Sequence, residues 1–191
     1  TFNAHAKKFI DAFRLNSVTS LSIKSAYPLE RELFDIVIID EASQCDVASA
    51  LPLIYRAKQL VVIGDPMQLK HITSVTESDE LVIKNHLALN ENPFIKYAEY
   101  SLWDYCHDLI TTAGANNTQI VLDSHYRCHP QIIGYSNEMF YQRRLGTTLK
   151  VCTKDTNCEL RYKGIIWVDV IGLQKSETRN VNEAEIDKAI S

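Results

Sequence analysis

Residues 34–46 read FDIVIIDEASQCD, a short apolar run that ends in two adjacent carboxylates. Short runs rich in Ile and Val are typical of strands that are covered on both faces, as in a parallel sheet. Asp40 and Glu41 follow the run directly, and the amide of Gln44 comes soon after them. The stretch therefore predicts a buried strand that carries polar side chains to the edge of a sheet.

A second run of the same kind, QLVVIGD at residues 59–65, ends in a Gly-Asp-Pro turn. Between the two runs, apolar residues recur at the spacing of one helix face: Val47, Ala50, Leu51 and Ile54. With Ser49 as its N-cap, such a helix would hold Pro52 in the first turn, where a missing N–H is harmless. Strand, helix and strand with short connections predict a right-handed βαβ unit, and so a parallel sheet in an α/β fold.

The rest of the chain continues this alternation of short strands and amphipathic helices. We expect helices within residues 4–13, 80–89, 101–111 and 129–145 and from 182 onward, and strands at 119–123 and 164–170. The Gly- and Asn-rich segment at 113–117 is typical of a linker. We therefore expect part of one α/β domain in residues 1–114 and the opening of another in residues 115–191.

The overall composition is that of an ordinary globular protein. The chain has 191 residues, a hydrophobic fraction of 46% and a net charge of −4, without the basic balance usual in nucleic-acid binders. No apolar run approaches the roughly 20 residues of a membrane span, and the five cysteines form no CxxC pair. We therefore expect reduced thiols, a cytoplasmic location and no membrane partner. Because the chain begins with Thr rather than Met, we also expect a piece of a longer protein.

The two predicted strands place polar groups where α/β proteins bind their ligands. Parallel sheets bind ligands at the carboxyl ends of their strands, where Asp40, Glu41, Gly64 and Asp65 fall. A nucleoside triphosphate with Mg²⁺ fits these groups, because a hard divalent ion takes oxygen ligands and a second carboxylate can orient or deprotonate water. Alternatively, Asp40 and Glu41 simply cap the next helix, since acidic residues favour helix N-termini.

Longer motifs favour the first interpretation. FDIVIIDEASQ (34–44), LVVIGDPMQL (60–69), HYRCHPQIIGYSNEMFY (125–141) and NVNEAE (180–185) occur in this order. The chain resembles the superfamily 1 helicases, in the branch of the nonsense-mediated-decay RNA helicase and its DNA-helicase relatives. The resemblance implies a RecA-like P-loop NTPase fold, parallel sheets with flanking helices, and a fragment that spans the end of motor domain 1 and the start of motor domain 2.

The resemblance also implies roles for single residues. In motor domain 1, Asp40 would bind Mg²⁺, Glu41 would activate water and Gln68 would sense the γ-phosphate. Gln44, Gly64 and Asp65 would lie near the nucleotide. In motor domain 2, Tyr126 would stack on the base of ATP. Arg127 would neutralise charge on the transferred phosphoryl group, although a Tyr-Arg pair taken alone is also typical of an interface.

Several positions depart from the family pattern or carry weaker predictions. His125 replaces the usual Gln of its motif, and Cys128 replaces the usual Met. Lys70 and His71 could contact a nucleic-acid backbone or simply belong to an exposed loop. Thr19 and Ser20 precede the first motif, where the family has a strand-contacting segment, so they are further candidate nucleic-acid contacts.

The implied activity is that of an ATP-dependent helicase or translocase on single-stranded DNA or RNA, and the resemblance favours 5′→3′ movement. An alternative with the same motifs is an ATP-gated switch or scaffold that clamps nucleic acid or protein without unwinding. No G-x-x-x-x-G-K-[ST] phosphate loop occurs in the chain. We therefore expect these 191 residues alone to bind ATP poorly and to hydrolyse it negligibly.

Overall fold

The computed structural model describes residues 2–90, 92, 95–115, 119–153, 165–172 and 181–190. The chain divides into two compact units, Thr1–Ile120 and Val121–Ser191. None of the described helices has the length and apolar composition that crossing a membrane requires.

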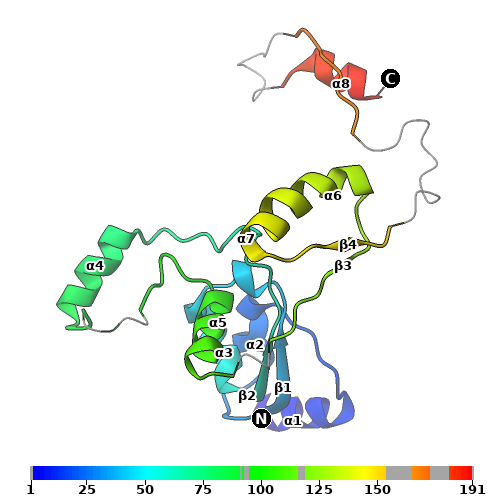
Figure 1. Cartoon of the computed structure of the whole chain (residues 1–191). Coiled ribbons are helices and arrows are strands. Elements are labelled where there is room, and N and C mark those ends of the chain that lie inside the picture. The colour runs from blue at the N-terminus through cyan, green and yellow to red at the C-terminus, as the bar shows by residue number, and fades with distance from the viewer. Residues whose placement is uncertain are drawn as a thin grey trace. The chain divides into compact units, whose positions relative to one another are not determined.

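The first unit is built on two parallel strands joined by a helix. β1 (Phe34–Ile39) pairs with β2 (Ala57–Val62), with Phe34 opposite Ala57 and Ile39 opposite Val62, and α3 (Val47–Tyr55) connects them (Figure 1). The predicted strand–helix–strand unit is confirmed, although β2 begins two residues earlier than expected, at Ala57. The two strands therefore end at the same edge of the sheet.

One face of this sheet packs on the hydrophobic core. Because side chains alternate along a strand, Val37 and Ile39 of β1 face the same way and pack with Leu60 and Val62 of β2. Helices α2 (Ile23–Ala26), α3 and α5 (Leu102–Thr112) complete the core. Its buried members are Ile23, Tyr27, Ile39, Ala42, Ala50, Leu53 and Leu102.

The opposite face of the sheet is apolar but exposed. Ile36 and Ile38 of β1 are 56% and 61% exposed, and Val61 of β2 is 43% exposed. The prediction that the first strand is covered on both faces is therefore wrong for the described residues. The run of Ile and Val correctly predicted a strand, but it could not show whether this chain itself provides the second covering layer.

Helix α3 begins earlier than the sequence pattern suggested. Its N-cap is Asp46, whose carboxylate accepts the Ser49 N–H at 2.9 Å, and not Ser49. Burial raises the pKa of Asp46, but the hydrogen bonds from Ser49 outweigh this effect and leave the pKa below its ordinary value. Pro52 consequently lies inside the helix rather than in its first turn. Asp46 rather than Ser49 is the N-cap because a carboxylate is a good N-cap acceptor and its negative charge is favourable at a helix N-terminus.

A buried arginine closes the C-terminal end of α3. Arg56 is only 2% exposed, and its guanidinium donates to three backbone carbonyls: Pro28 at 2.8 Å, Pro52 at 2.6 Å and Tyr27 at 3.0 Å. Burial lowers the pKa of Arg56. This single side chain therefore ties the loop before β1 to the helix between the two strands.

We expect Arg56→Leu to lower the free energy of unfolding by about 2–5 kcal/mol, because three buried carbonyls lose a charged donor. Chemical denaturation of the two proteins measures the difference. Arg31→Leu is the matched control, because Arg31 lies at the surface in an ion pair with Glu32 at 3.1 Å and should cost less than about 1 kcal/mol. Equal costs for the two variants would contradict a special role for Arg56.

The other helices of the first unit flank this core or extend from it. Their bounds are α1 Phe2–Ala12, η1 Ser20–Ser22, η2 Ala42–Gln44 and α4 Glu77–His86. Thr76 and Ser101 form capping boxes at the starts of α4 and α5, so both helices have strong N-terminal signals. The helix predicted at 80–89 is confirmed but begins three residues earlier, at Glu77.

The second unit has a short parallel pair and a longer helical segment. β3 (Ser124–His125) pairs with β4 (Lys150–Val151), and α6 (Pro130–Ser136) continues through a π-helical stretch, η4 (Asn137–Gln142), into α7 (Arg143–Leu145). Pro130 stands at the start of α6, as predicted. The helix expected from 182 onward is α8 (Glu183–Ile190).

Two predicted strands of this region are wrong. Residues 119–123 form no strand, and Ile120 and Leu122 are 81% and 79% exposed; pairing begins only at Ser124. Residues 165–170 likewise form no strand, and Gly164 lies outside the described residues. An apolar run forms a strand only where a partner strand is present, and neither run has one among the described residues.

Candidate functional site

The polar residues predicted from the first two motifs meet at one edge of the first unit. The backbone ladder continues just past the strands: the Ile63 N–H donates to the Ile39 carbonyl at 2.9 Å, and the Ala42 N–H donates to the Ile63 carbonyl at 2.8 Å. These bonds hold together the loop that follows β1 and the loop that follows β2. The residues of the two motifs therefore lie together at the carboxyl-terminal edge of the sheet.

Asp40 and Glu41 occupy the end of β1 in an unusual backbone geometry. Glu41 has φ 53° and ψ 38°, a left-handed conformation that is uncommon for a residue with a side chain. The Asp40 carboxylate accepts the Glu41 N–H at 2.9 Å and so stabilises the turn. Both side chains are exposed. Such strain costs on the order of 1–3 kcal/mol and clusters at functional sites.

Ser43 and Gln44, which follow this turn, make hydrogen bonds that hold the site together. The Gln44 side-chain amide donates to the Glu41 carboxylate at 3.4 Å, and the Gln44 N–H donates to the Glu41 carbonyl at 2.9 Å. Ser43 is only 2% exposed, and its hydroxyl accepts the Asp65 N–H at 3.4 Å. Ser43 is a functional candidate that residue type alone does not reveal, although it lies within the motif at 34–44.

Gly64 and Asp65 shape the loop after β2. A Cβ atom at Gly64 would lie 2.8 Å from Cδ1 of Trp103 and 3.0 Å from the Ser43 backbone nitrogen, so only glycine fits there without a shift. The Asp65 carboxylate accepts the Met67 N–H at 2.9 Å and the Gln68 side-chain amide at 3.1 Å. Asp65 thus fixes the turn that carries Gln68, and Gly64 has a packing role independent of any ligand.

Lys70 and His71, predicted as nucleic-acid contacts, make contacts inside the first unit. Lys70 Nζ lies 3.3 Å from the Asp104 carboxylate and 3.3 Å from the Glu99 carbonyl. Burial raises the pKa of Asp104, but hydrogen bonds from Ser101 and the charge of Lys70 outweigh it and leave the pKa below its ordinary value. His71 Nε2 lies 3.0 Å from the Tyr97 carbonyl. These contacts anchor the far end of the Gln68 loop.

Thr19 and Ser20 lie at the start of the short helix η1, before α2. Thr19 is the residue that precedes the helix, and its hydroxyl donates to the Ser22 hydroxyl at 2.9 Å. Ser20 is its first residue. Neither residue contacts the edge formed by the two motifs through any hydrogen bond among the described residues, so their predicted role stays a prediction.

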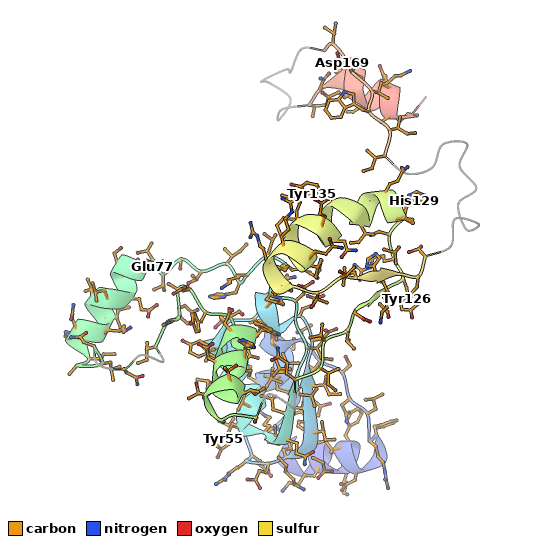
Figure 2. All side chains as sticks on the ribbon, viewed as in Figure 1. Tyr55, Glu77, Tyr126, His129, Tyr135 and Asp169 are labelled. Atoms are coloured by element: carbon orange, nitrogen blue, oxygen red, sulfur yellow. The ribbon has the colours of Figure 1, made fainter. Side chains whose placement is uncertain are left out.

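Tyr126 and Arg127 belong to the second unit and follow β3 directly. Tyr126 is 72% exposed and is labelled in Figure 2. Arg127 is also exposed and makes no hydrogen bond or ion pair with another described residue. Both side chains are therefore available for a ligand.

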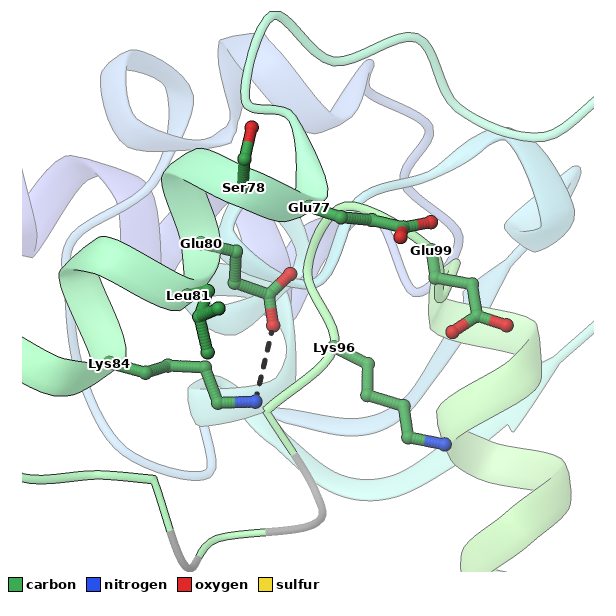
Figure 3. Close-up of a pocket in the computed structure, with 7 residues that line it drawn as sticks. All are labelled: Glu77, Ser78, Glu80, Leu81, Lys84, Lys96 and Glu99. Atoms are coloured by element: carbon green, nitrogen blue, oxygen red, sulfur yellow. Dashed lines mark ion pairs between the residues drawn. The ribbon is translucent and has the colours of Figure 1, made fainter.

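A hollow in the described part of the first unit lies elsewhere. It measures ≈ 420 Å³, is formed by α4 and residues 96–99, and is drawn in Figure 3. Its lining mixes both charges and is given by Glu77, Ser78, Glu80, Leu81, Lys84, Lys96 and Glu99. No predicted site residue lines it, and the Lys84–Glu80 ion pair at 3.6 Å occupies part of its wall. We assign it no role.

The edge formed by the two motifs gathers acidic and amide side chains beside a tight turn. Two exposed carboxylates, two side-chain amides and a tightly packed glycine turn lie at the carboxyl ends of adjacent parallel strands. No cluster of three metal-binding side chains occurs among the described residues. A cation held here would take one or two carboxylates from the protein and its other ligands from phosphate and water, as Mg²⁺ commonly does.

Comparisons with known proteins agree with this geometry. Two family models, each described as an AAA domain, match residues 7–74 and 100–191. Helicase SEN1 of Saccharomyces cerevisiae is 33% identical over 113 residues, which cover 59% of this chain and 4% of that protein. The 5'-3' DNA helicase ZGRF1 of Mus musculus is 31% identical over 165 residues, 84% of this chain and 8% of the relative.

A third relative is the uncharacterized ATP-dependent helicase MJ0104 of Methanocaldococcus jannaschii. It is 30% identical over 169 residues, 82% of this chain and 22% of its own length. The chain thus spans less than a quarter of each of these relatives. The matched domains and the parallel strands confirm an α/β fold of the RecA-like P-loop type. The chain belongs to the superfamily 1 helicases, in the branch that contains Helicase SEN1 and the nonsense-mediated-decay RNA helicase.

Proposed function

We propose that this chain is part of an ATP-dependent helicase or translocase that couples ATP hydrolysis to movement along single-stranded DNA or RNA. The observation that carries the proposal is the convergence of Asp40, Glu41, Gln44, Asp65 and Gln68 at one sheet edge. The names of the relatives, which are helicases, support it. We also propose a cytoplasmic location for the whole protein, in line with the reduced thiols expected from the sequence.

Asp40 is the residue that would hold Mg²⁺. Its carboxylate is exposed at the end of β1, and its Oδ1 atom already accepts the Glu41 N–H. One hydrogen bond leaves further lone pairs on the carboxylate for an ion, so the donor set fits a cation that shares its coordination with phosphate and water. When bound, Mg²⁺ would neutralise charge on the phosphates.

Glu41 acts as the base that orients and deprotonates the attacking water. Its backbone is left-handed, and the Gln44 side-chain amide donates to one of its carboxylate oxygens at 3.4 Å. A carboxylate held in this way and open to solvent meets the geometric need of a general base. The left-handed turn at Glu41 therefore sets where this carboxylate lies at the end of β1.

Gln68 senses the γ-phosphate from the second loop. Its amide nitrogen donates to Asp65, so its amide oxygen is left to turn toward other donors. The loop is anchored beyond Gln68 by Lys70 and His71, which contact the segment leading into α5. A change at Gln68 can therefore be passed through a defined set of contacts to the rest of the first unit.

The second unit contributes Tyr126 and Arg127 to the same reaction. The planar guanidinium of Arg127 suits bidentate binding of phosphate, and the Tyr126 ring suits stacking on a base. Both side chains are exposed and directly follow a strand. Because the chain contains no phosphate loop, these residues alone hydrolyse ATP negligibly, and the complete protein is required.

ATP turnover by the full-length protein tests the proposal. Single-stranded DNA or RNA should raise the rate of phosphate release at saturating ATP and Mg²⁺, because binding of the strand stabilises the hydrolysing state. Duplex of the same length without a tail is the control. If neither single-stranded DNA nor single-stranded RNA changes the rate of phosphate release, hydrolysis is not coupled to nucleic acid and the proposal is contradicted.

A further inference from the structure

The turn that carries Tyr126 and Arg127 is closed by contacts on both sides. His125 Nε2 accepts the backbone N–H of Cys128 at 2.8 Å, so the imidazole bridges the two ends of the turn. The Cys152 N–H donates to the His125 carbonyl at 2.7 Å. The Thr153 hydroxyl donates to the Cys128 carbonyl, also at 2.7 Å. All of these contacts lie within the second unit.

The contacts act on the backbone of the turn, and the side chains of Tyr126 and Arg127 take part in none of them. Tyr126 is 72% exposed, and Arg127 is exposed without a hydrogen bond or ion pair to another described residue. A guanidinium on a loose loop would lose much of its rate contribution, since a misplacement of about 1 Å can cost on the order of 10²-fold. A closed turn fixes the backbone of Arg127, and so the point from which its side chain extends.

The imidazole of His125 must accept in this contact. A backbone N–H can only donate, so Nε2 contributes its lone pair and the ring proton of the neutral form lies on Nδ1. The family usually has Gln at this position. The Oε1 atom of Gln lies as many bonds from Cβ as Nε2 of His does, so Gln can place an acceptor at the same point.

We propose that His125 is a positioning residue for Arg127: its Nε2 atom closes the 125–128 turn and so sets the guanidinium for phosphoryl transfer. Thr153, in the segment that follows β4, supports the same turn through its hydrogen bond to the Cys128 carbonyl. This inference rests on the proposed role of Arg127 in ATP hydrolysis. It explains how His can replace Gln in this motif, because the acceptor is kept while the chemical group changes.

The test uses the full-length protein with saturating single-stranded nucleic acid. We expect His125→Leu to lower kcat for ATP by about 10–100-fold, with KM for ATP changed by less than about three-fold. His125→Gln should restore kcat to within about three-fold of the original protein, because it returns an acceptor. Thr153→Val should lower kcat and Thr153→Ser should not, because only Ser keeps the hydroxyl.

A double variant separates positioning from general stability. In a protein that already carries Arg127→Ala, His125→Leu should lower kcat by no more than about two-fold further, because the group that it positions is gone. Losses that multiply in full would overturn the inference. So would an unchanged kcat for both His125→Leu and Thr153→Val in a protein where Arg127→Ala is strongly impaired.

Failure of the underlying function gives a different result. If Arg127→Ala itself leaves kcat unchanged, the proposed role of Arg127 is wrong and the inference falls with it. If His125→Leu fails to fold, thermal unfolding detects it, and Thr153→Val with its Thr153→Ser control carries the same test at the other end of the turn.

Discussion

Glu41→Gln is expected to lower the nucleic-acid-stimulated kcat of the full-length protein by about 10²–10⁴-fold, the usual contribution of a general base. The amide is nearly the same size as the carboxylate but cannot take a proton from water. Gln44 can still hydrogen-bond to it, because an amide oxygen also accepts. ATP affinity should therefore change little, as measured by equilibrium binding of a fluorescent ATP analogue.

Glu32→Gln is the matched control for this variant. Glu32 is the other glutamate with a left-handed backbone in the described chain, at φ 56°, and it pairs with Arg31 before β1. It lies outside both motifs, so its kcat should match that of the original protein. Turnover that persists in Glu41→Gln would show that the water is activated by another group.

Arg127→Ala is expected to lower kcat by about 10³–10⁵-fold, the range found for arginine fingers. The loss arises because charge on the transferred phosphoryl group would have no cation from the second unit. Arg127→Lys should recover only part of the rate, since an ammonium lacks the planar fork of a guanidinium. Steady-state turnover at saturating ATP measures all three proteins.

Arg143→Ala serves as the control in the same unit. Arg143 is an exposed arginine that pairs with Glu138 at 2.6 Å on the surface of the helical segment. Its removal should leave kcat within about two-fold, because an exposed pair contributes little. Equal losses for Arg143→Ala and Arg127→Ala would point to charge in general and contradict a specific finger.

The sequence predicted the elements whose signals are local. Apolar runs and helical spacing located β1, β2, α5 and α6, and the pairing of β1 with β2 followed from the short connection through α3. The runs at 119–123 and 165–170 carry the same signal but form no strands, because strand formation depends on a partner. The sequence of one segment alone does not predict which distant segment, if any, will pair with it.

The site shows the same division between local and distant information. The motifs predicted that Asp40, Glu41 and Asp65 follow neighbouring strands, and the parallel pairing of β1 with β2 brings the loops that carry them to one sheet edge. They could not show that the Asp65 N–H donates to the Ser43 hydroxyl, a hydrogen bond that joins two loops far apart in sequence. Likewise, the sequence could not show that Lys70, a candidate nucleic-acid contact, forms an ion pair with Asp104 in the fold.

If ATP hydrolysis that depends on Glu41 drives movement along a nucleic acid, the protein should displace one strand of a tailed duplex. The full-length protein should separate a labelled duplex that carries a single-stranded tail, in DNA or RNA and with one tail polarity preferred, only when ATP and Mg²⁺ are present. The Glu41→Gln protein should bind the same substrate and leave it paired. Turnover that is stimulated by nucleic acid without any displacement, on either substrate and with either tail, would contradict the claim and indicate an ATP-gated clamp.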